Sequence, residues 1–365
     1  MTGGCAISDK TEKRKPDTPT ILIVVLRYIG DVLVTTPLAL SIKTAYPEAE
    51  IDYLVFAGTD KAVFKNPLIR TIYTIPRKGT SFRFLLSLFR RYDLALAANP
   101  SDRTVIAAAV AGKRSVGLIY NLKKEWWKRV VLDSSSICYN RFHVVTAMLS
   151  LARDIGISPM PRAVMGFDDN DLAFARANIS AKRFILIHPY SMKRCKYWPA
   201  ENWGKLAALI HEDTDCTAVF TATPSPEDKG FLEEILSFSP RDVMTFSCDL
   251  NQFAAALKDC AAYVGIDTAA THMAAALDAP TIALYGPTLT RYWGPWPNGC
   301  EEPSPFAANK GIQRKGYVTV VQKDWECVPC NKEFCRITKR GRIECLEAIS
   351  PEEVLQEIIN RLKLH

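Results

Sequence analysis

The sequence predicts an α/β fold with two domains, each built on a parallel β-sheet covered by helices. A chain of 365 residues is long for one hydrophobic core and comfortable for two. Short β-rich runs alternate with amphipathic helical patterns in both halves, and the alternation stops between residues 157 and 182. Ligands of such sheets bind at the carboxyl ends of the strands, so we expect the two sheets to face a central cleft.

The first domain is expected at residues 19–180, after a polar, disordered tail at 1–18 that does not resemble a secretory signal. Five strands are predicted, at 21–26, 51–56, 71–75, 94–98 and 115–119. Helices are predicted at about 31–45, 82–91, 102–111 and 140–155. The strands are apolar on both faces, which is typical of a buried parallel sheet. The stretch 157–182, with SPMPRA and FDDND, is the predicted linker.

The second domain is expected at residues 181–348. Four strands are predicted, at 184–188, 216–221, 261–266 and 281–286. Helices are predicted at about 201–212, 226–237, 250–259 and 269–278. A C-terminal helix is expected within 349–365, with Ser350 as its N-cap and Pro351 in its first position.

Composition limits the class of protein. No stretch approaches 18 uninterrupted apolar residues, so no membrane span is predicted. Eleven cysteines without an export signal predict reduced thiols in the cytosol. Residues 1–180 hold 25 Lys and Arg against 16 Asp and Glu, whereas the remainder holds 21 against 23. The basic half fits an anionic partner such as nucleic acid, phospholipid or a phosphorylated glycan, and it equally fits an ordinary solvated surface.

The first motif is YIGDV, at the end of the strand 21–26. It has only Gly30 between strand and helix, so it lacks both the GxGxxG fingerprint of a dinucleotide-binding dehydrogenase and the P-loop pattern. Asp31 is then a helix cap, a ribose ligand or a catalytic base, and the local sequence favours the cap. A helix N-terminus would lower the pKa of this carboxyl group.

The second motif, HPYSMKRCKYWPAENW, follows the strand 184–188. Two hydroxyls and three cations precede a helix that begins near Pro199, and together they would suit a diphosphate, although a basic surface loop is the alternative. These side chains are Tyr190, Ser191, Lys193, Arg194 and Lys196.

The third motif, VGIDTAATHMAAALDAPTIALYGPT, follows the strand 261–266. Asp267 and Thr268 form a turn, and the small residues Ala269 and Ala270 open a helix with His272 on its first turn. Small residues let backbone N–H groups approach an anionic ligand, while Asp267 and His272 could bind sugar hydroxyls or balance phosphate charge. The alternative is a capped helix with a core-facing histidine.

The fourth motif is a cysteine group with the pattern C-x2-C-x4-C-x9-C. Four thiolates could hold a structural zinc or iron ion tetrahedrally. The second pair lacks CxxC spacing, so unmetallated thiols in a surface loop are the alternative. The four residues are Cys327, Cys330, Cys335 and Cys345.

Taken in order, IGDVLVTTPLALSIKTAYPEAEIDYL, CKYWPAENW, GIDTAATHMAAALDAPTIALYGPT and CVPCNKEFC with CLEAISPEEV resemble glycosyltransferase family 9. This family includes the ADP-heptose:lipopolysaccharide heptosyltransferases. The resemblance runs from about Ile21 to the C-terminus, and RYWGPWPNG and GYVTVVQKDWECVPC are most similar to the heptosyltransferase III branch. It implies the GT-B fold of two Rossmann-like domains, the first binding the acceptor and the second the nucleotide-sugar.

The resemblance also implies a reaction. A heptose would pass from ADP-heptose to the phosphorylated inner core of lipopolysaccharide, with inversion and without a catalytic metal, on the cytoplasmic face of the inner membrane. Asp31 would be the general base, with Arg27 and Gly30 on the acceptor side. Lys196 would hold the donor diphosphate in place of a divalent cation.

The same resemblance implies a donor site around the second and third motifs. Its residues would be Tyr190, Ser191, Lys196, Asp267, Thr268, Ala269, Ala270 and His272, with Glu227 as a ribose ligand. The family often has glycine where this chain has Ala269, and HPYSMKRCK is less rich in hydroxyls than the corresponding loops. A different nucleotide-sugar or acceptor is therefore the nearest alternative. A non-enzymatic nucleic-acid-binding protein is a remote one, against which the acidic balance of the second half speaks.

Overall fold

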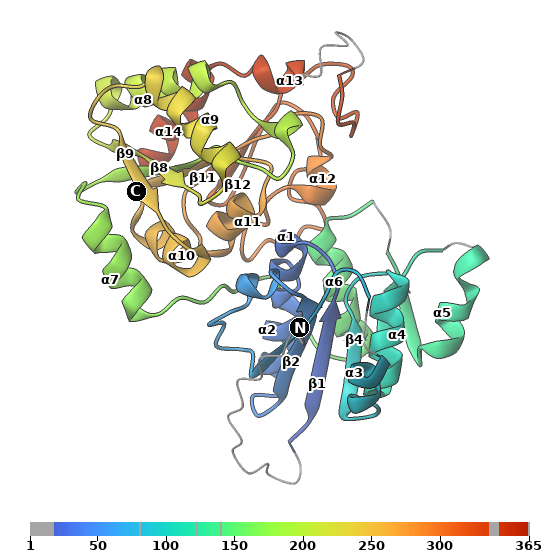
Figure 1. The fold of residues 1–365 in the computed structure, drawn as a ribbon. Coiled ribbons are helices and arrows are strands. Elements are labelled where there is room, and N and C mark those ends of the chain that lie inside the picture. The colour runs from blue at the N-terminus through green and yellow to red at the C-terminus, as the bar shows by residue number, and fades with distance from the viewer. Residues whose placement is uncertain (1–17, 80–81, 122, 139–140, 336–342, 364–365) are drawn as a thin grey trace. The chain divides into compact units, whose positions relative to one another are not determined.

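The computed structural model describes residues 18–79, 82–121, 123–138, 141–335 and 343–363. The chain divides into two compact units, Met1–Gly166 and Phe167–His365, called unit 1 and unit 2 below. Each unit is an α/β domain built on one sheet (Figure 1), so the predicted fold class is confirmed. None of the described helices is both long and apolar enough to cross a membrane.

The sheet of unit 1 has the strand order β3-β2-β1-β4-β5-β6, and all five pairings are parallel. The strands are β1 (Thr20–Val25), β2 (Glu50–Phe56), β3 (Thr71–Ile75), β4 (Tyr92–Ala97), β5 (Gly112–Ile119) and β6 (Ser134–Ile137). β1 is buried along its whole length because helices cover both faces of the sheet. The order changes direction at β1 and β4, where such sheets bind ligands beyond the strand ends.

The helices of unit 1 form a layer on each face of this sheet. They are α1 (Ile29–Leu33), α2 (Thr36–Ala45), α3 (Phe82–Ser87), α4 (Asp102–Ala111), α5 (Trp126–Val131) and α6 (Val144–Asp154), with short 3₁₀ turns at Asp60–Ala62 and Lys123–Glu125. α2 packs against α6, whereas α4 contacts both α3 and α5 (Figure 1). The predicted helix 31–45 is in fact two helices. Pro37 in the first turn of α2 cannot donate a backbone hydrogen bond to a preceding turn, so a new helix starts there.

The sheet of unit 2 has the order β12-β13-β11-β10-β7-β8-β9. Its strands are β7 (Phe184–His188), β8 (Thr217–Ala222), β9 (Met244–Ser247), β10 (Ala262–Ile266), β11 (Thr281–Leu284), β12 (Ile312–Lys315) and β13 (Val318–Val321). All pairings are parallel except that of β12 with β13 at one edge. Loops from β7, β10 and β11 therefore meet at one edge of the sheet.

The helices of unit 2 surround this sheet. They are α7 (Asp169–Asn178), α8 (Ala200–Asp213), α9 (Pro226–Ser237), α10 (Leu250–Asp259), α11 (Ala269–Ala276), α12 (Thr290–Trp293), α13 (Glu344–Glu347) and α14 (Pro351–Leu362), with a 3₁₀ turn at Arg194–Lys196. α7 lies within the stretch predicted as a linker and packs against α10. Ser350 caps α14 and Pro351 is its first residue, as predicted.

Two buried tryptophans fix the start of α8 in the core of unit 2. The rings of Trp198 and Trp203 pack edge to face with centroids 4.8 Å apart, and neither side chain is exposed. The indole N–H of Trp198 donates to the carbonyl of Ile349 at 3.0 Å, which connects α8 to the start of α14. These contacts hold the chain just after Lys196 in place, so the second motif has a rigid base.

Candidate active site

Asp31 lies at the carboxyl edge of the unit 1 sheet, in the first turn of α1. The preceding strand is held in register beyond its end because the backbone N–H of Leu26 donates to Asn99 Oδ1 at 3.1 Å. The N-cap residue is Tyr28, and Asp31 Oδ2 accepts from its backbone N–H at 3.3 Å. Asp31 therefore caps the helix from the third helical position, not from the N-cap position that the local sequence favours.

The ionisation of Asp31 differs from the sequence-based expectation. Arg27 Nε lies 3.5 Å from Asp31 Oδ1, and the Asp31 side chain is 13% exposed. Burial raises the pKa of Asp31, and this effect outweighs the Arg27 charge and the Tyr28 backbone hydrogen bond, which lower it. The expected lowering of this pKa is thus wrong, because desolvation dominates the short helix terminus. A raised pKa makes the carboxylate a stronger base.

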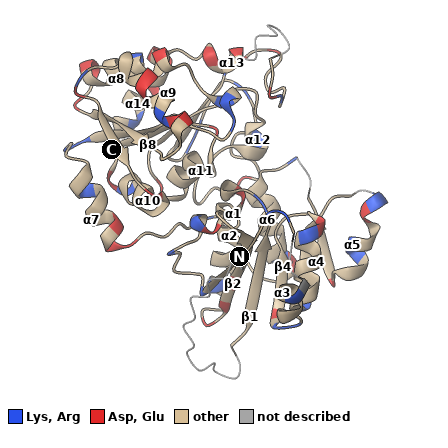
Figure 2. Cartoon of the chain, in the orientation of Figure 1, with Lys and Arg blue, Asp and Glu red and all other residues tan. Residues whose placement is uncertain are grey.

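Further cations surround this edge of unit 1. The Arg77 guanidinium lies 5.0 Å from the centroid of the Tyr28 ring, and the Arg103 guanidinium lies 4.9 Å from that of Phe56. Arg103 also donates to the carbonyl of Pro76 at 3.0 Å, which joins the start of α4 to the loop after β3. Figure 2 shows basic bands on α4 and α5. The motifs did not reveal Arg77 and Arg103, although both follow predicted strand ends at a short distance.

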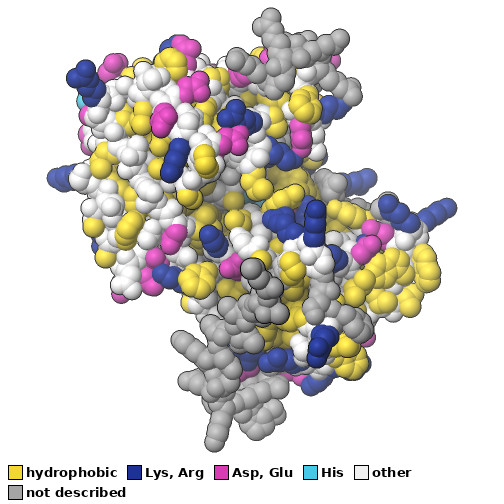
Figure 3. Space-filling view, viewed as in Figure 1, with side chains coloured by type: hydrophobic (Ala, Val, Ile, Leu, Met, Phe, Trp, Pro, Cys, Tyr) yellow, Lys and Arg dark blue, Asp and Glu magenta, His cyan; other side chains and the backbone are white. Residues whose placement is uncertain are grey.

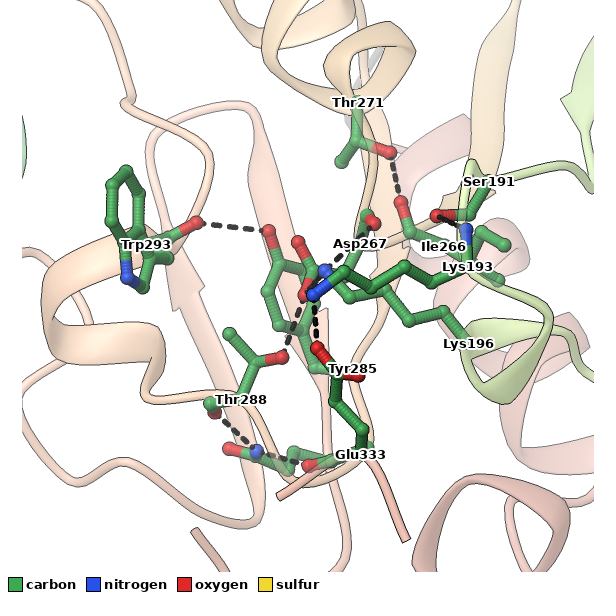
Figure 4. Close-up of polar contacts among 12 residues, drawn as sticks. Ser191, Lys193, Lys196, Ile266, Asp267, Thr271, Tyr285, Thr288, Trp293 and Glu333 are labelled. Atoms are coloured by element: carbon green, nitrogen blue, oxygen red, sulfur yellow. Dashed lines mark hydrogen bonds and ion pairs between the residues drawn. The ribbon is translucent and has the colours of Figure 1, made fainter. Parts of the chain in front are cut away.

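The central cluster of unit 2 consists of Lys196, Asp267 and Thr288 (Figure 4). Lys196 Nζ lies 2.5 Å from Asp267 Oδ2, and Thr288 Oγ1 donates to the same oxygen at 2.6 Å. Asp267 follows β10 directly, whereas Thr288 belongs to the YGPT turn after β11. The structure thus brings together two residues that the motifs predicted, and it adds Thr288. The position of YGPT after a strand that neighbours β10 was the available signal.

The turn from β10 into α11 has a specific local cause. Gly265 leaves room for the Tyr263 ring, because an added Cβ would lie 2.1 Å from the Tyr263 hydroxyl oxygen. That oxygen lies 3.1 Å from Thr271 Oγ1, and Thr271 in turn donates to the carbonyl of Ile266 at 2.5 Å. Thr268 is the N-cap residue of α11, and its side chain makes no capping hydrogen bond. The first backbone N–H groups of α11, at Ala269 and Ala270, are therefore suited to an external anion.

His272 lies on the first turn of α11 beside this cluster. Burial lowers the pKa of His272 to about 4, and although Asp267 opposes this shift, the ring is neutral at pH 7. Its Nδ1 is buried and has no hydrogen-bond partner within the described residues. A neutral imidazole does not balance phosphate charge, but it can bind a sugar hydroxyl. Of the two ligand roles that the sequence left open for His272, the binding of a sugar hydroxyl remains, beside the alternative of a core-facing histidine.

The remaining cations of the second motif are each paired with an acid. Lys193 pairs with Glu333 and Arg194 pairs with Glu227, all four with more than half of their side chains exposed. Glu227, expected to bind ribose, thus already carries a cation at the start of α9. Ser191 Oγ accepts from the backbone N–H of Lys193 at 3.4 Å.

Tyr190, the other hydroxyl of this loop, lies in the hydrophobic core of unit 2 with 3% of its surface exposed. Its ring packs edge to face against His188, with centroids 5.4 Å apart. Its hydroxyl has no hydrogen-bond partner among the described residues. In this structure Tyr190 supports the second motif from the core of unit 2.

The four cysteines lie near one another in unit 2 without forming disulfides. Burial raises the pKa of the Cys345 thiol to about 12, and the neighbouring charges of Cys330, Cys327 and Cys335 raise it further. Across the described part of the chain, no three His, Cys, Asp or Glu side chains are arranged to hold a metal ion. The thiols thus gather, but they do not form a ligand set.

The segment that carries these cysteines contacts the donor-side loops. The backbone N–H of Asn331 donates to the carbonyl of Pro287 at 2.7 Å. Gln322 Nε2 donates to the carbonyls of Gly286 at 2.6 Å and Thr288 at 3.0 Å. Together with the Lys193–Glu333 pair, these bonds hold the YGPT turn and the second motif against one segment.

The chain is similar to known proteins in sequence and in fold. The model of glycosyltransferase family 9 (heptosyltransferase) matches residues 83–305. Lipopolysaccharide heptosyltransferase 3 of Escherichia coli (strain K12) is 26% identical over 292 residues, which cover 74% of this chain and 83% of that protein.

Two solved structures show the same fold. The glycosyl transferase family 9 protein from Veillonella parvula has a TM-score of 0.76 and 18% identity, and the match covers 97% of this chain and 100% of that one. E. coli ADP-heptose lps heptosyltransferase II has a TM-score of 0.71 and 20% identity, covering 94% of this chain and 99% of that one.

Proposed function

The chain belongs to glycosyltransferase family 9, and from this premise we propose that it transfers a heptose from ADP-heptose to the inner core of lipopolysaccharide. The names of a curated relative and a structural neighbour support the donor and the acceptor. The observation that carries the proposal is the Lys196–Asp267–Thr288 cluster beside the N-terminus of α11, which fits a nucleotide diphosphate.

In unit 1, Asp31 is the proposed general base. Its carboxylate takes the proton of the acceptor hydroxyl while the hydroxyl oxygen forms a bond to the anomeric carbon. The bond between that carbon and the diphosphate oxygen breaks at the same time, and ADP leaves with the bonding electrons. Attack opposite the leaving group inverts the anomeric configuration. Burial of Asp31 supports this role, because the raised pKa strengthens the base.

In unit 2, Lys196 is the proposed electrostatic partner of the diphosphate. An ammonium group has three donors. Asp267 takes one through Oδ2 at 2.5 Å and a second through its backbone carbonyl at 3.4 Å, which holds the group in place. The remaining donor serves a diphosphate oxygen, and the positive charge stabilises the charge that develops on the leaving ADP. The backbone N–H groups of Ala269 and Ala270 add the positive end of α11. A divalent cation is not needed in this mechanism.

On the acceptor side, Arg27, Arg77 and Arg103 support an anionic substrate. They lie around the carboxyl edge of the unit 1 sheet, where Gly30 and Asp31 begin α1. The phosphates of a phosphorylated sugar core would pair with these positive charges. We place the enzyme at the cytoplasmic face of the inner membrane, where such an acceptor is anchored.

The four cysteines have no chemical role in the proposed reaction. Their mutual proximity suits a structural zinc or iron ion, but their side chains are not arranged as a ligand set. We assign no chemical step to a metal there. Metal analysis of the purified protein decides between a bound ion and free thiols.

A different nucleotide-sugar is the second candidate, because Ala269 stands where the family often has glycine. Its methyl group lies at the first residue of α11, next to the expected phosphate position. Thermal-shift measurements with ADP, UDP, GDP and CMP distinguish the two, since only a ligand of the native state raises Tm. Stabilisation by ADP alone supports the proposal, and stabilisation by another nucleotide alone favours the second candidate.

Transfer itself is tested with ADP-heptose and purified core acceptor in the presence of EDTA. Mass spectrometry should detect an acceptor heavier by one heptose, with ADP as the second product. Complete loss of product under EDTA contradicts metal-independent catalysis. Absence of product with and without EDTA contradicts the assigned donor or acceptor.

A further inference from the structure

We propose that helices α3, α4 and α5 of unit 1 form a docking surface for an anionic lipid bilayer. Six large apolar side chains are exposed on these helices and on the turn after α3, and we call them the apolar face. They are Leu86 (51% exposed), Phe89 (63%), Ile106 (44%), Trp126 (67%), Val130 (71%) and Val131 (44%). This inference deepens the proposed function in one respect, the contact with a membrane, and rests on it there.

The apolar face lies on neighbouring elements. α4 contacts both α3 and α5, so Ile106 belongs to the middle helix of the three. Figure 3 shows hydrophobic side chains gathered where Figure 1 places α5, with Lys and Arg beside them. Single exposed apolar residues are normal on soluble proteins, whereas a contiguous apolar surface with a charged rim marks an interaction site.

The charges around the apolar face are mostly positive. Two acidic residues lie beside it, Glu125 in the segment 123–131 and Asp102 at the start of α4, and both are paired with Lys128. Six exposed cations flank the apolar side chains: Arg83, Arg90, Arg91, Lys123, Lys124 and Arg129. Apolar side chains that include a tryptophan, surrounded by lysine and arginine, match the interface of an anionic bilayer. A protein partner would need an acidic rim of the same extent.

α5 presents its part of this face from a fixed position. Lys128 is 1% exposed, and its ammonium group contacts Pro100 O at 2.6 Å, Glu125 Oε1 at 2.9 Å and Asp102 Oδ1 at 2.9 Å. All three of its donors are therefore satisfied, two of them by Pro100 and Asp102 at the start of α4. Trp126 and Val130, four residues apart, share the helix side opposite Lys128. The buried lysine thus holds these two side chains toward solvent.

The docking surface adjoins the edge that carries Asp31. α5 follows β5, and the backbone N–H of Tyr120, just after β5, donates to Glu125 Oε2 at 3.1 Å. Burial raises the pKa of Tyr120, and the positive charge of Arg27 opposes this shift. Tyr120 therefore also lies near Arg27, the residue that pairs with Asp31. A bilayer on the apolar face would hold a lipid-anchored acceptor next to the catalytic edge of the same unit.

Vesicle flotation of the full chain tests the surface. Wild type should float with vesicles of phosphatidylethanolamine and phosphatidylglycerol, but much less with phosphatidylcholine or at high salt. We design Trp126→Ser/Val130→Ser to remove apolar contacts and Lys123→Gln/Lys124→Gln to remove charge. Each should lower the partition coefficient roughly tenfold or more. Ile312→Ser, at an exposed apolar position of unit 2 (40%), is the control and should bind as wild type does.

Three results overturn the proposal: no flotation of wild type, equal flotation with both lipid compositions, or wild-type flotation of both double variants. Sedimentation velocity tests whether a second copy of the chain occupies the apolar face instead of a bilayer. A wild-type dimer that Trp126→Ser/Val130→Ser dissociates would assign the face to a second copy of the chain. Near-UV circular dichroism verifies that each variant is folded.

Two acceptors, one in vesicles and one water-soluble, distinguish a failure of this inference from a failure of the proposed function. Heptose transfer to core acceptor in vesicles should fall in Trp126→Ser/Val130→Ser, while transfer to deacylated, water-soluble acceptor stays unchanged. Wild type that binds anionic vesicles but transfers no heptose contradicts the proposed function alone. Wild type that transfers heptose to both acceptors without binding vesicles contradicts the docking surface alone.

Discussion

Asp31 is the residue whose environment decides how the proposed reaction depends on pH. Its pKa is raised by burial, and a base works only when it is deprotonated. The acid limb of the kcat/KM profile should therefore lie above the ordinary pKa of aspartate. A profile measured in buffers of constant ionic strength locates this limb. A limb at or below the ordinary aspartate value would contradict the assignment.

The same shift has a consequence for stability. A carboxyl group with a raised pKa in the folded state contributes stability below its ordinary pKa, and this contribution is lost as pH rises through the raised value. At pH 7 the buried carboxylate thus opposes folding. We expect Asp31→Asn to leave Tm unchanged or to raise it, because the amide can still accept from the backbone of Tyr28. Differential scanning calorimetry at pH 7 measures this, and a large drop in Tm would mean that the charge stabilises the fold.

Lys196 and Asp267 should behave as one unit toward the donor. Lys196→Ala removes the positive charge that is proposed to face the donor diphosphate. It should lower kcat by about 10²–10³-fold. Asp267→Asn removes the carboxylate that holds the ammonium group, so the double variant should lose less than the sum of both effects. Transfer kinetics and calorimetric titration with ADP measure this cycle. Additive effects would show that Asp267 does not act through Lys196. Lys205→Ala, in an exposed pair with Glu201 on α8, is the matched control.

Two histidines of unit 2 should be neutral throughout the physiological range. Burial lowers the pKa of both His188 and His272 to about 4. Their ring resonances in NMR spectra should stay constant from pH 8 to pH 6 and titrate only near pH 4. A midpoint near 6.5 for His272 would show that its ring is hydrated and can become charged.

At the scale of elements, α5 depends on one buried lysine. Lys128→Ala leaves Glu125 and Asp102 without their cation and should lower the free energy of unfolding by about 2 kcal/mol. Lys113→Ala removes an exposed pair with Asp93 and should cost less than about 1 kcal/mol. Urea denaturation of both variants measures the difference. Equal effects would contradict the anchoring role of Lys128.

Elements with a strong pattern were predictable, and those defined by their neighbours were not. The strands 71–75 and 184–188 and the helices 102–111, 226–237 and 250–259 match the structure residue by residue. β6 was missed because SSSI has no apolar alternation and becomes a strand only by pairing with β5. α7 was missed because DNDLAFARAN is polar on most sides, and its place depends on packing against α10.

The residues of the candidate site were likewise predictable only in part. Motifs that follow strand ends revealed Asp31, Lys196 and Asp267, because a strand end fixes where the next residues lie. Thr288, Arg77 and Arg103 reach their places through tertiary packing, which local spacing does not encode. The pKa of Asp31 depends on burial by distant segments, so sequence reasoning gave the wrong direction for its shift.

At the scale of the whole molecule, the proposed mechanism divides the reaction between the two units. Unit 1 carries the proposed base, a cationic edge and the apolar face, while unit 2 carries the cluster suited to a nucleotide diphosphate. The excess of positive charge lies in residues 1–180, as expected where the acceptor and the membrane are anionic. Loss of the base should therefore leave donor binding intact.

The most direct test compares Asp31→Asn with wild type in heptose transfer and in donor binding. With ADP-heptose and core acceptor, the variant should lose about 10²–10⁴-fold in kcat, while its calorimetric affinity for ADP stays that of wild type. Loss of ADP affinity would make Asp31 a donor ligand. Transfer at the wild-type rate would show that another group takes the proton, and it would contradict the central claim.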